Sequence, residues 1–180
     1  AMITGKVTYS EAIDCFIESE HPFPDYFYGY WDIAGPEKAS ALRLHFPRVQ
    51  VSGWSSVYCY TQSGNWYSIN DWDGEKWTEW IEGNKLSLIF SANINDCGNY
   101  GFQMDKYEAL MPFEGVTVTL TPGDMTTTTD ENGCFAFSGL ALGTYTVTPS
   151  FNGTLFGPLS REITVETMQL TPGADFMTSN

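Results

Sequence analysis

The chain has 180 residues, of which 42% are hydrophobic and 16% aromatic, so it can bury a core and is not composed like a disordered segment. Its formal net charge of -14 argues against nucleic acids and anionic membranes as partners, because both are bound by basic surfaces. No apolar run approaches the roughly 20 residues of a membrane-spanning helix, so we expect no insertion into a membrane.

Segments with strand character follow one another along the whole chain. They alternate apolar and polar residues or are rich in β-branched ones, and turn residues such as Gly, Asn and Asp separate them. A single stretch, residues 37–43, looks helical, and it merges into a strand pattern. This predicts an all-β protein of two β-sandwiches. The predicted strands are residues 7–9, 42–51, 57–60, 85–90, 116–120, 134–137, 144–148 and 163–165.

The composition of the chain changes near Pro112. All six Trp residues and most of the charged residues precede it, whereas the following part is rich in Thr and Gly. We interpret this position as a domain boundary.

Three motifs mark the part after this boundary. They are G-V-x-V-x-L from Gly115, T-x-x-D-x-x-G-x-F-x-F over residues 127–137 and L-x-x-G-x-Y-x-V over residues 140–147. Strand alternation places the apolar residues of each motif on one face. This part resembles the carboxypeptidase regulatory-like and Cna B-type domains, which implies a seven-stranded, transthyretin-like β-sandwich.

The first strand of these families reads roughly I-x-G-x-V-x and stands shortly before G-V-x-V. The residues before Gly115 do not match it, whereas the start of the chain does. We therefore predict that residues 1–10 and 111–180 form one domain, with a second domain of residues 11–110 inserted. Alternatively, the strand belongs to the inserted domain. The matching residues are Ile3, Thr4, Gly5, Lys6, Val7 and Thr8.

This strand has two possible places. It can fold onto its own domain, or it can enter a neighbouring subunit, because a sandwich that lacks a strand offers an unpaired edge to another chain. Head-to-tail exchange of this kind builds filaments.

The inserted part has a resemblance of its own. SEHPFP at residues 19–24, W-x-I at Trp31, L-x-L-x-F at residues 42–46 and Y-G-F at residues 100–102 are similar to a CUB domain. This implies a β-sandwich of a kind found in extracellular proteins. Many CUB domains bind calcium through three acids, and the aligned positions here are Ser52, Ser55 and Ala92. Without these carboxylates we expect no calcium site.

No motif for catalysis, a metal or a cofactor is recognisable. His21 and His45 lack the partners of a nucleophilic triad. Residues 70–74, NDWDG, lack the acids of an EF-hand and read as a solvated turn. Some Cna B-type domains join a lysine to an asparagine, but the stretch that carries the assisting acid is replaced by TPSF at residues 148–151, so we expect no such bond from Lys6.

Four cysteines allow three complete disulfide pairings or a set of buried thiols, and the sequence leaves these alternatives open. They are Cys15, Cys59, Cys97 and Cys134. No pair has the spacing of zinc ligands, so we expect no zinc site.

Three tryptophans, Trp54, Trp66 and Trp72, stand in turns rich in Gly, Ser and Asp. Exposed aromatic side chains bind sugar rings or partner proteins. Alternatively, these three cap the ends of the sandwich.

Together these features predict a non-catalytic, extracellular or cell-surface protein with a structural or adhesive role. It would act through contacts with a protein partner or with further copies of itself, as a surface appendage or filament subunit that uses its N-terminal strand. The alternative is an accessory module of a secreted hydrolase that binds a polysaccharide or a protein.

Overall fold

The computed structural model describes residues 1–52, 54–69, 74–94 and 99–179. The regular structure in these ranges consists of β-strands, and sheets pack in sandwich-like layers, which confirms the predicted all-β class. In residues 37–43, where the sequence looked helical, a turn leads into a strand. Within the described ranges, no helix is long and apolar enough to span a membrane.

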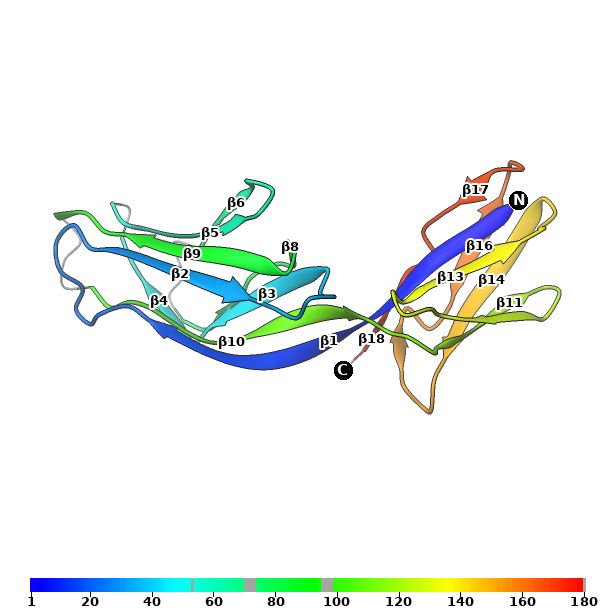
Figure 1. The fold of residues 1–180 in the computed structure, drawn as a ribbon, viewed down its shortest axis with the longest axis horizontal. Helices are drawn as coiled ribbons and strands as arrows, with labels where there is room; N and C mark the ends of the chain where they lie inside the picture. Colours follow the sequence, from blue (N-terminus) through cyan, green and yellow to red (C-terminus); the bar gives the residue numbers. More distant parts are fainter. Residues whose placement is uncertain (53, 70–73, 95–98, 180) are drawn as a thin grey trace. The chain divides into compact units, whose positions relative to one another are not determined.

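The chain forms two compact units. Unit 1 comprises Ala1–Ser10 and Met111–Asn180, and unit 2 comprises Glu11–Leu110. Two long strands have residues in both units: β1 (Met2–Glu18) and β10 (Gly101–Pro112) (Figure 1).

Unit 1 contains two sheets. In the first, the N-terminal half of β1 pairs antiparallel with β13 and parallel with β17 and β18, and β15 pairs with β18. The second has the order β12-β11-β14-β16. Within unit 1, the strands that pair with β1 therefore all come from the C-terminal part of the chain. The bounds are β11 (Thr117–Thr121), β12 (Met125–Thr128), β13 (Cys134–Ser138), β14 (Gly143–Ser150), β15 (Phe156–Gly157), β16 (Arg161–Val165), β17 (Leu170–Thr171) and β18 (Phe176–Thr178).

The core of unit 1 lies between these sheets. Ile3 and Val7 of β1 have no exposed surface. The alternation predicted for the C-terminal motifs is confirmed, because each of their apolar faces is buried while Cys134 on the opposite face is exposed. The buried residues of these motifs are Val116, Val118, Leu120, Phe135, Phe137 and Val147.

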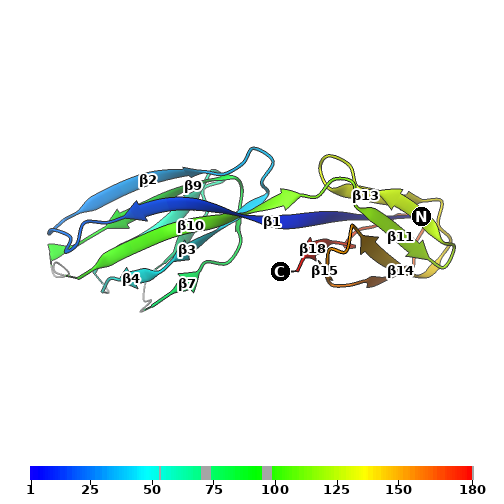
Figure 2. The same cartoon turned by 90° about the horizontal axis from the view of Figure 1, so that it is seen from below.

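Unit 2 also contains two sheets (Figure 2). One has the order β2-β9-β5-β6. In the other, β1, β10, β3 and β7 follow one another, β4 pairs with β10 and β8 pairs with β3. The bounds are β2 (Tyr28–Ala34), β3 (Ala41–Phe46), β4 (Arg48–Gln50), β5 (Ser56–Thr61), β6 (Trp66–Ser68), β7 (Lys76–Trp77), β8 (Ile81–Glu82) and β9 (Lys85–Ser91).

Aromatic rings form the centre of the unit 2 core. The Phe90 ring lies 4.8 Å from that of Phe23 and 5.9 Å from that of Phe102. Trp31 of β2 meets Phe102 edge-on at 5.3 Å, so β2 is tied to the opposite sheet. Gly29 makes this possible, because a Cβ there would lie 2.2 Å from the Trp31 ring. The inward residues of β2 are therefore committed to the core, and the alternate ones face solvent.

Gly5→Ala tests the packing of β1 in unit 1. A Cβ at this position would lie 2.2 Å from the Ala174 carbonyl oxygen and 2.5 Å from the Phe135 ring. We expect the free energy of unfolding of unit 1, measured by hydrogen exchange of the β13 amides, to fall by about 1–3 kcal/mol. Gly157→Ala is the matched control, since its added Cβ would have no neighbour closer than 3.8 Å. Equal stability of the two variants would contradict this packing.

Candidate ligand-binding face

One face of the β2-β9-β5-β6 sheet carries a group of aromatic side chains turned away from the core of unit 2. We call it the aromatic face. Four of its members are 40–65% exposed, and the fifth, Tyr58, is half-buried. An exposed aromatic cluster of this kind marks a surface for binding. The members are Tyr28 and Tyr30 of β2, Tyr58 and Tyr60 of β5, and Trp66 of β6.

Strand register brings these side chains together from three strands. Tyr30 lies opposite Ile89, and Ile89 lies opposite Tyr58 on its other side. In the next row, Tyr60 lies opposite Trp66. Directly opposed residues in a sheet share a face, so Tyr30, Ile89 and Tyr58 form one row across it. Ring contacts join the β5 and β6 members of the aromatic face, because Tyr58 lies 5.9 Å from Tyr60 and 6.3 Å from Trp66.

A polar cluster accompanies the rings. The Tyr30 hydroxyl donates to Asp32 Oδ1 at 2.8 Å, and the Ser87 hydroxyl donates to the same oxygen at 3.0 Å. The two hydroxyl oxygens lie 2.8 Å apart. The only hydrogen-bonding protons in this cluster are those of the two hydroxyls, whereas the hydroxyl and carboxylate oxygens have lone pairs that can accept several further hydrogen bonds. The cluster therefore has spare acceptor capacity for a ligand that brings O–H or N–H donors.

A groove adjoins this polar cluster. It has a volume of about 400 Å³ and is lined by Asp32, Tyr60, Gln62, Lys85 and Ser87, among others. Carboxylate, hydroxyl, amide and ammonium groups thus stand beside an exposed ring. A concave surface with this mixture holds a polar ligand and fixes its orientation.

The Tyr58 hydroxyl stays protonated on this face. Burial raises the pKa of the Tyr58 phenol, and the neighbouring Tyr28 and Tyr60 raise it further. A phenol with a raised pKa keeps its proton through the physiological range, so Tyr58 remains a neutral hydrogen-bond donor on this face.

Of the three predicted tryptophans, Trp66 lies on the aromatic face and is 65% exposed. Trp54 is 68% exposed in the loop between β4 and β5, and Trp72 lies outside the described residues. None of the four tyrosines of the aromatic face was predicted from the sequence. Their spacing, Y-x-Y at residues 28–30 and again at residues 58–60, was the available signal, because residues two apart in a strand share a face.

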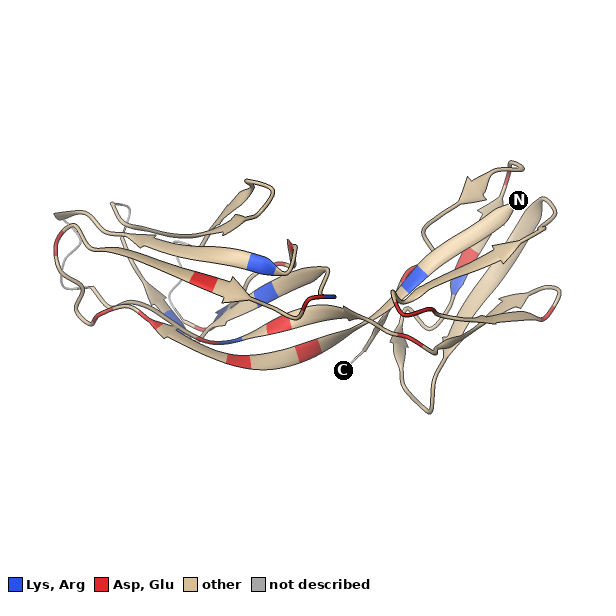
Figure 3. Cartoon of the chain, viewed as in Figure 1, with Lys and Arg blue, Asp and Glu red and all other residues tan. Residues whose placement is uncertain are grey.

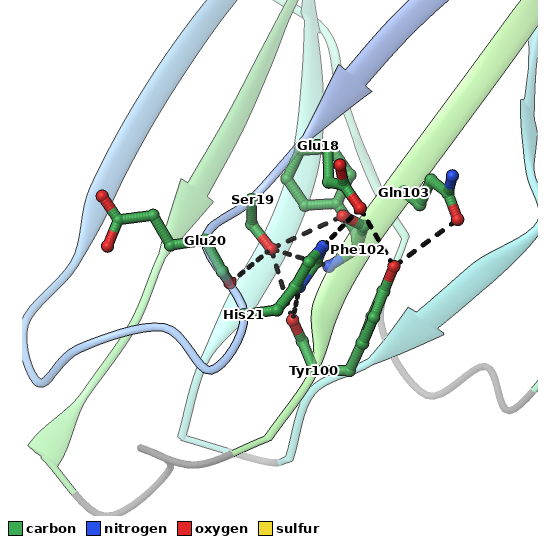
Figure 4. Close-up of polar contacts among 7 residues, drawn as sticks. All are labelled: Glu18, Ser19, Glu20, His21, Tyr100, Phe102 and Gln103. Atoms are coloured by element: carbon green, nitrogen blue, oxygen red, sulfur yellow. Dashed lines mark hydrogen bonds and ion pairs between the residues drawn. The ribbon is translucent and has the colours of Figure 1, made fainter.

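Ser19, His21 and Glu18 lie together at one end of unit 2 but do not form a nucleophilic triad (Figure 4). His21 Nε2 lies 2.6 Å from a Glu18 carboxylate oxygen, and Nδ1 lies 2.5 Å from the Tyr100 carbonyl oxygen. Both ring nitrogens thus face acceptors, whereas a triad needs one nitrogen to accept the serine proton. The Ser19 hydroxyl instead accepts the Phe102 N–H at 3.1 Å. The group connects β10 to the chain after β1.

His45 is also held between acceptors. Its Nδ1 lies 2.6 Å from Asp105 and its Nε2 lies 2.8 Å from Glu75. The side chain faces away from the leucines of β3, as alternation predicts, yet the residue is only 3% exposed. The Trp77 ring, 4.6 Å away, packs against it. His45 therefore joins β3, β10 and the segment around β7, and it has no nitrogen free for a substrate.

The positions that align with the calcium ligands of CUB domains differ in burial, and Ser52 is the exposed one. Ser55 is buried and accepts the Asn93 N–H at 3.3 Å, and Ala92 is buried. Among the residues that the structure describes, no group of three or more His, Cys, Asp and Glu side chains is placed to hold a metal ion. Residues 70–73 of the NDWDG turn lie outside them.

The predicted assembly strand is folded into its own chain. Lys6 lies opposite Cys134, and its N–H donates to Asp175 at 2.9 Å. The Thr8 hydroxyl donates to the Phe176 carbonyl at 3.5 Å, and Thr4 is half-buried.

Comparison with known proteins relates part of this structure to a family. Residues 107–176 match the carboxypeptidase regulatory-like domain. This family consists of non-catalytic β-sandwich modules, and the match confirms the resemblance for that stretch of the chain. Strand β1 and nearly all of unit 2 lie outside the matched residues, so the CUB and Cna B-type resemblances stay predictions.

Among solved structures, the chain is similar to the Bacillus anthracis TIE protein, with 14% identity and a TM-score of 0.31. The similarity covers 94% of this chain and 41% of that structure, so this chain spans less than half of its length. No curated protein matches the chain.

The described cysteines differ in accessibility, and this predicts their reactivity. Cys15, Cys59 and Cys134 are free thiols, of which Cys59 is buried and Cys134 exposed. Burial raises the pKa of Cys59 to about 12. Because the thiolate is the reactive form, we expect iodoacetamide at pH 8 to alkylate Cys134 and to leave Cys59 unmodified. Peptide mass spectrometry measures both.

Unfolding in urea exposes the Cys59 thiol and lowers its pKa toward the ordinary value, so Cys59 should then react as fast as Cys134. Rapid alkylation of Cys59 in the folded protein would contradict its burial.

Proposed function

We propose that this protein is a non-catalytic adhesive module of the cell exterior that binds its partner through the aromatic face of unit 2. The observation that carries this proposal is the group of rings on one sheet face, of which Trp66 is 65% and Tyr28 62% exposed. Exposure of large apolar rings to water is unfavourable. A partner that covers the rings removes this apolar area from water, which contributes favourable free energy to binding.

A non-catalytic role agrees with the chemistry of the described residues. His21 and His45 have carboxylate or carbonyl oxygens at both ring nitrogens. Residues 107–176 match a non-catalytic family. Exposed aromatic rings provide contact area for binding and supply no group for turnover of a substrate. The extracellular location is part of this proposal and is motivated by the resemblances of both units.

The double variant Tyr30→Ala/Trp66→Ala tests adhesion. Truncation of a central aromatic side chain to Ala typically costs more than about 1 kcal/mol of binding free energy. We therefore expect the double variant to bind at least about tenfold more weakly than the wild type. The surfaces tested are immobilised extracellular-matrix proteins, neutral polysaccharides and cells. Binding is measured by surface plasmon resonance and cell-adhesion counts, and the melting temperature checks the fold.

Leu159→Ala is the control, because this residue of unit 1 is 70% exposed and the substitution also removes exposed apolar area. Unchanged adhesion of the double variant on every surface that the wild type binds would refute the proposed role of the aromatic face.

Self-association through β1 is a second candidate function. The strand binds residues far along the chain: Ile3 lies opposite Phe137, and the Ala1 ammonium donates to the Leu140 carbonyl, 139 residues away. The same contacts are available to the strand of another copy. Exchange of β1 between copies would make a head-to-tail contact and a filament, as the N-terminal motif suggested.

Deletion of residues 1–9 tests this exchange. The deletion removes the buried Ile3 and Val7, so unit 1 should lose several kcal/mol of stability. If copies exchange β1, the wild type forms filaments, the deletion abolishes them, and the peptide AMITGKVTY restores the lost stability. Electron microscopy and thermal unfolding measure these outcomes. A wild type that stays monomeric at millimolar concentration would exclude the exchange.

A further inference from the structure

We propose that the ligand of the aromatic face is a neutral polysaccharide, whose pyranose rings stack on Trp66 and the tyrosines while their hydroxyls bind the polar cluster and the groove. This inference rests on the proposed adhesive function and names its ligand. Three features of this face support a neutral sugar chain: the extent of the rings, the surplus of hydrogen-bond acceptors, and the charge of the protein.

The rings cover an extended, shallow surface. They come from β2, β5 and β6, and β9 lies between β2 and β5. With neighbouring strands about 4.8 Å apart, the face spans roughly 14 Å from β2 to β6, which is room for more than one sugar ring. The apolar side of a pyranose ring packs on an aromatic face much as another flat ring does. A chain of sugar rings fits such a surface better than a single small molecule does.

The polar groups lie where the hydroxyls of a stacked sugar would reach. Asp32 Oδ1 already accepts from Tyr30 and Ser87, and the carboxylate has lone pairs for further donors. The adjoining groove is also lined by Lys85 and Gln62, whose side chains supply donors. Sugar hydroxyls donate and accept at once, so they can use both kinds of group. An apolar protein side chain would remove water from the remaining lone pairs of the Asp32 carboxylate without replacing those hydrogen bonds, which is costly.

Charge selects a neutral sugar chain over an anionic one. The protein has 22 Asp and Glu residues against eight Lys and Arg, and acidic residues occur in both units (Figure 3). The groove itself is lined by one carboxylate, Asp32, and one ammonium, Lys85, so it offers no excess of positive charge to an anionic ligand. Glycosaminoglycans and other anionic polymers would be repelled, as would nucleic acids. A neutral glycan has no net charge and therefore meets no electrostatic repulsion at this surface.

Isothermal titration calorimetry of the full chain with neutral hexasaccharides tests this inference. The probes are cellohexaose, mannohexaose and chitohexaose, with a heparin hexasaccharide as the anionic comparison. We expect at least one neutral probe to bind and heparin not to bind. Trp66→Ala and Asp32→Asn should each weaken that binding by fivefold or more. Leu159→Ala and Glu162→Gln should leave it unchanged, because they make similar changes at exposed positions of unit 1.

The outcomes separate this inference from the proposed adhesive function. If none of the neutral probes binds, or heparin binds more tightly, while Tyr30→Ala/Trp66→Ala still abolishes adhesion to a protein surface, the sugar is excluded and the adhesive function stands. If a neutral probe binds but Trp66→Ala and Asp32→Asn bind it like the wild type, the assigned site is wrong. If the double variant adheres normally to every surface, both proposals fall.

Discussion

The pairing of the first strand with the last third of the chain is the constraint on which unit 1 depends. Residues Met2–Lys6 fill the place beside β13, and Ile3 and Val7 enter the core without any exposed surface. Gly5 allows the Phe135 ring and the Ala174 carbonyl to approach the backbone. Because these contacts join residues far apart in the sequence, unit 1 cannot be completed until β13, β17 and β18 have been made.

Of the two sheets in unit 2, one contains the strands that continue into unit 1, and the other does not. The chain enters unit 2 along β1 and leaves it along β10, and these strands are neighbours in one sheet. The β2-β9-β5-β6 sheet has no strand in common with unit 1. Side chains on the outer face of that sheet are therefore free to vary for binding without disturbing the strands that the two units share. The aromatic face lies there.

The histidines show how tertiary contacts decide chemistry. Alternation alone places His45 opposite the leucines of β3, where a solvent-facing imidazole would be available to a ligand. The carboxylates that hold it come from Asp105, 60 residues further on, and Glu75, 30 residues further on. No local pattern announces such partners, because strands that pair need not be near in sequence. A histidine whose two nitrogens face acceptors connects strands and does not accept a proton from a nucleophile.

The sequence by itself determined the all-β class and the inward faces of the C-terminal strands, because both follow from a two-residue period that any strand obeys. It also named Trp66, together with Trp54 and Trp72, as a candidate for an exposed aromatic residue. Only the tertiary structure decided which side chains stand beside Trp66. Tyr30 and Tyr58 join one surface because Ile89 of β9 pairs with both. Register between strands arises from packing of the whole unit, and the local sequence of any one strand does not contain it.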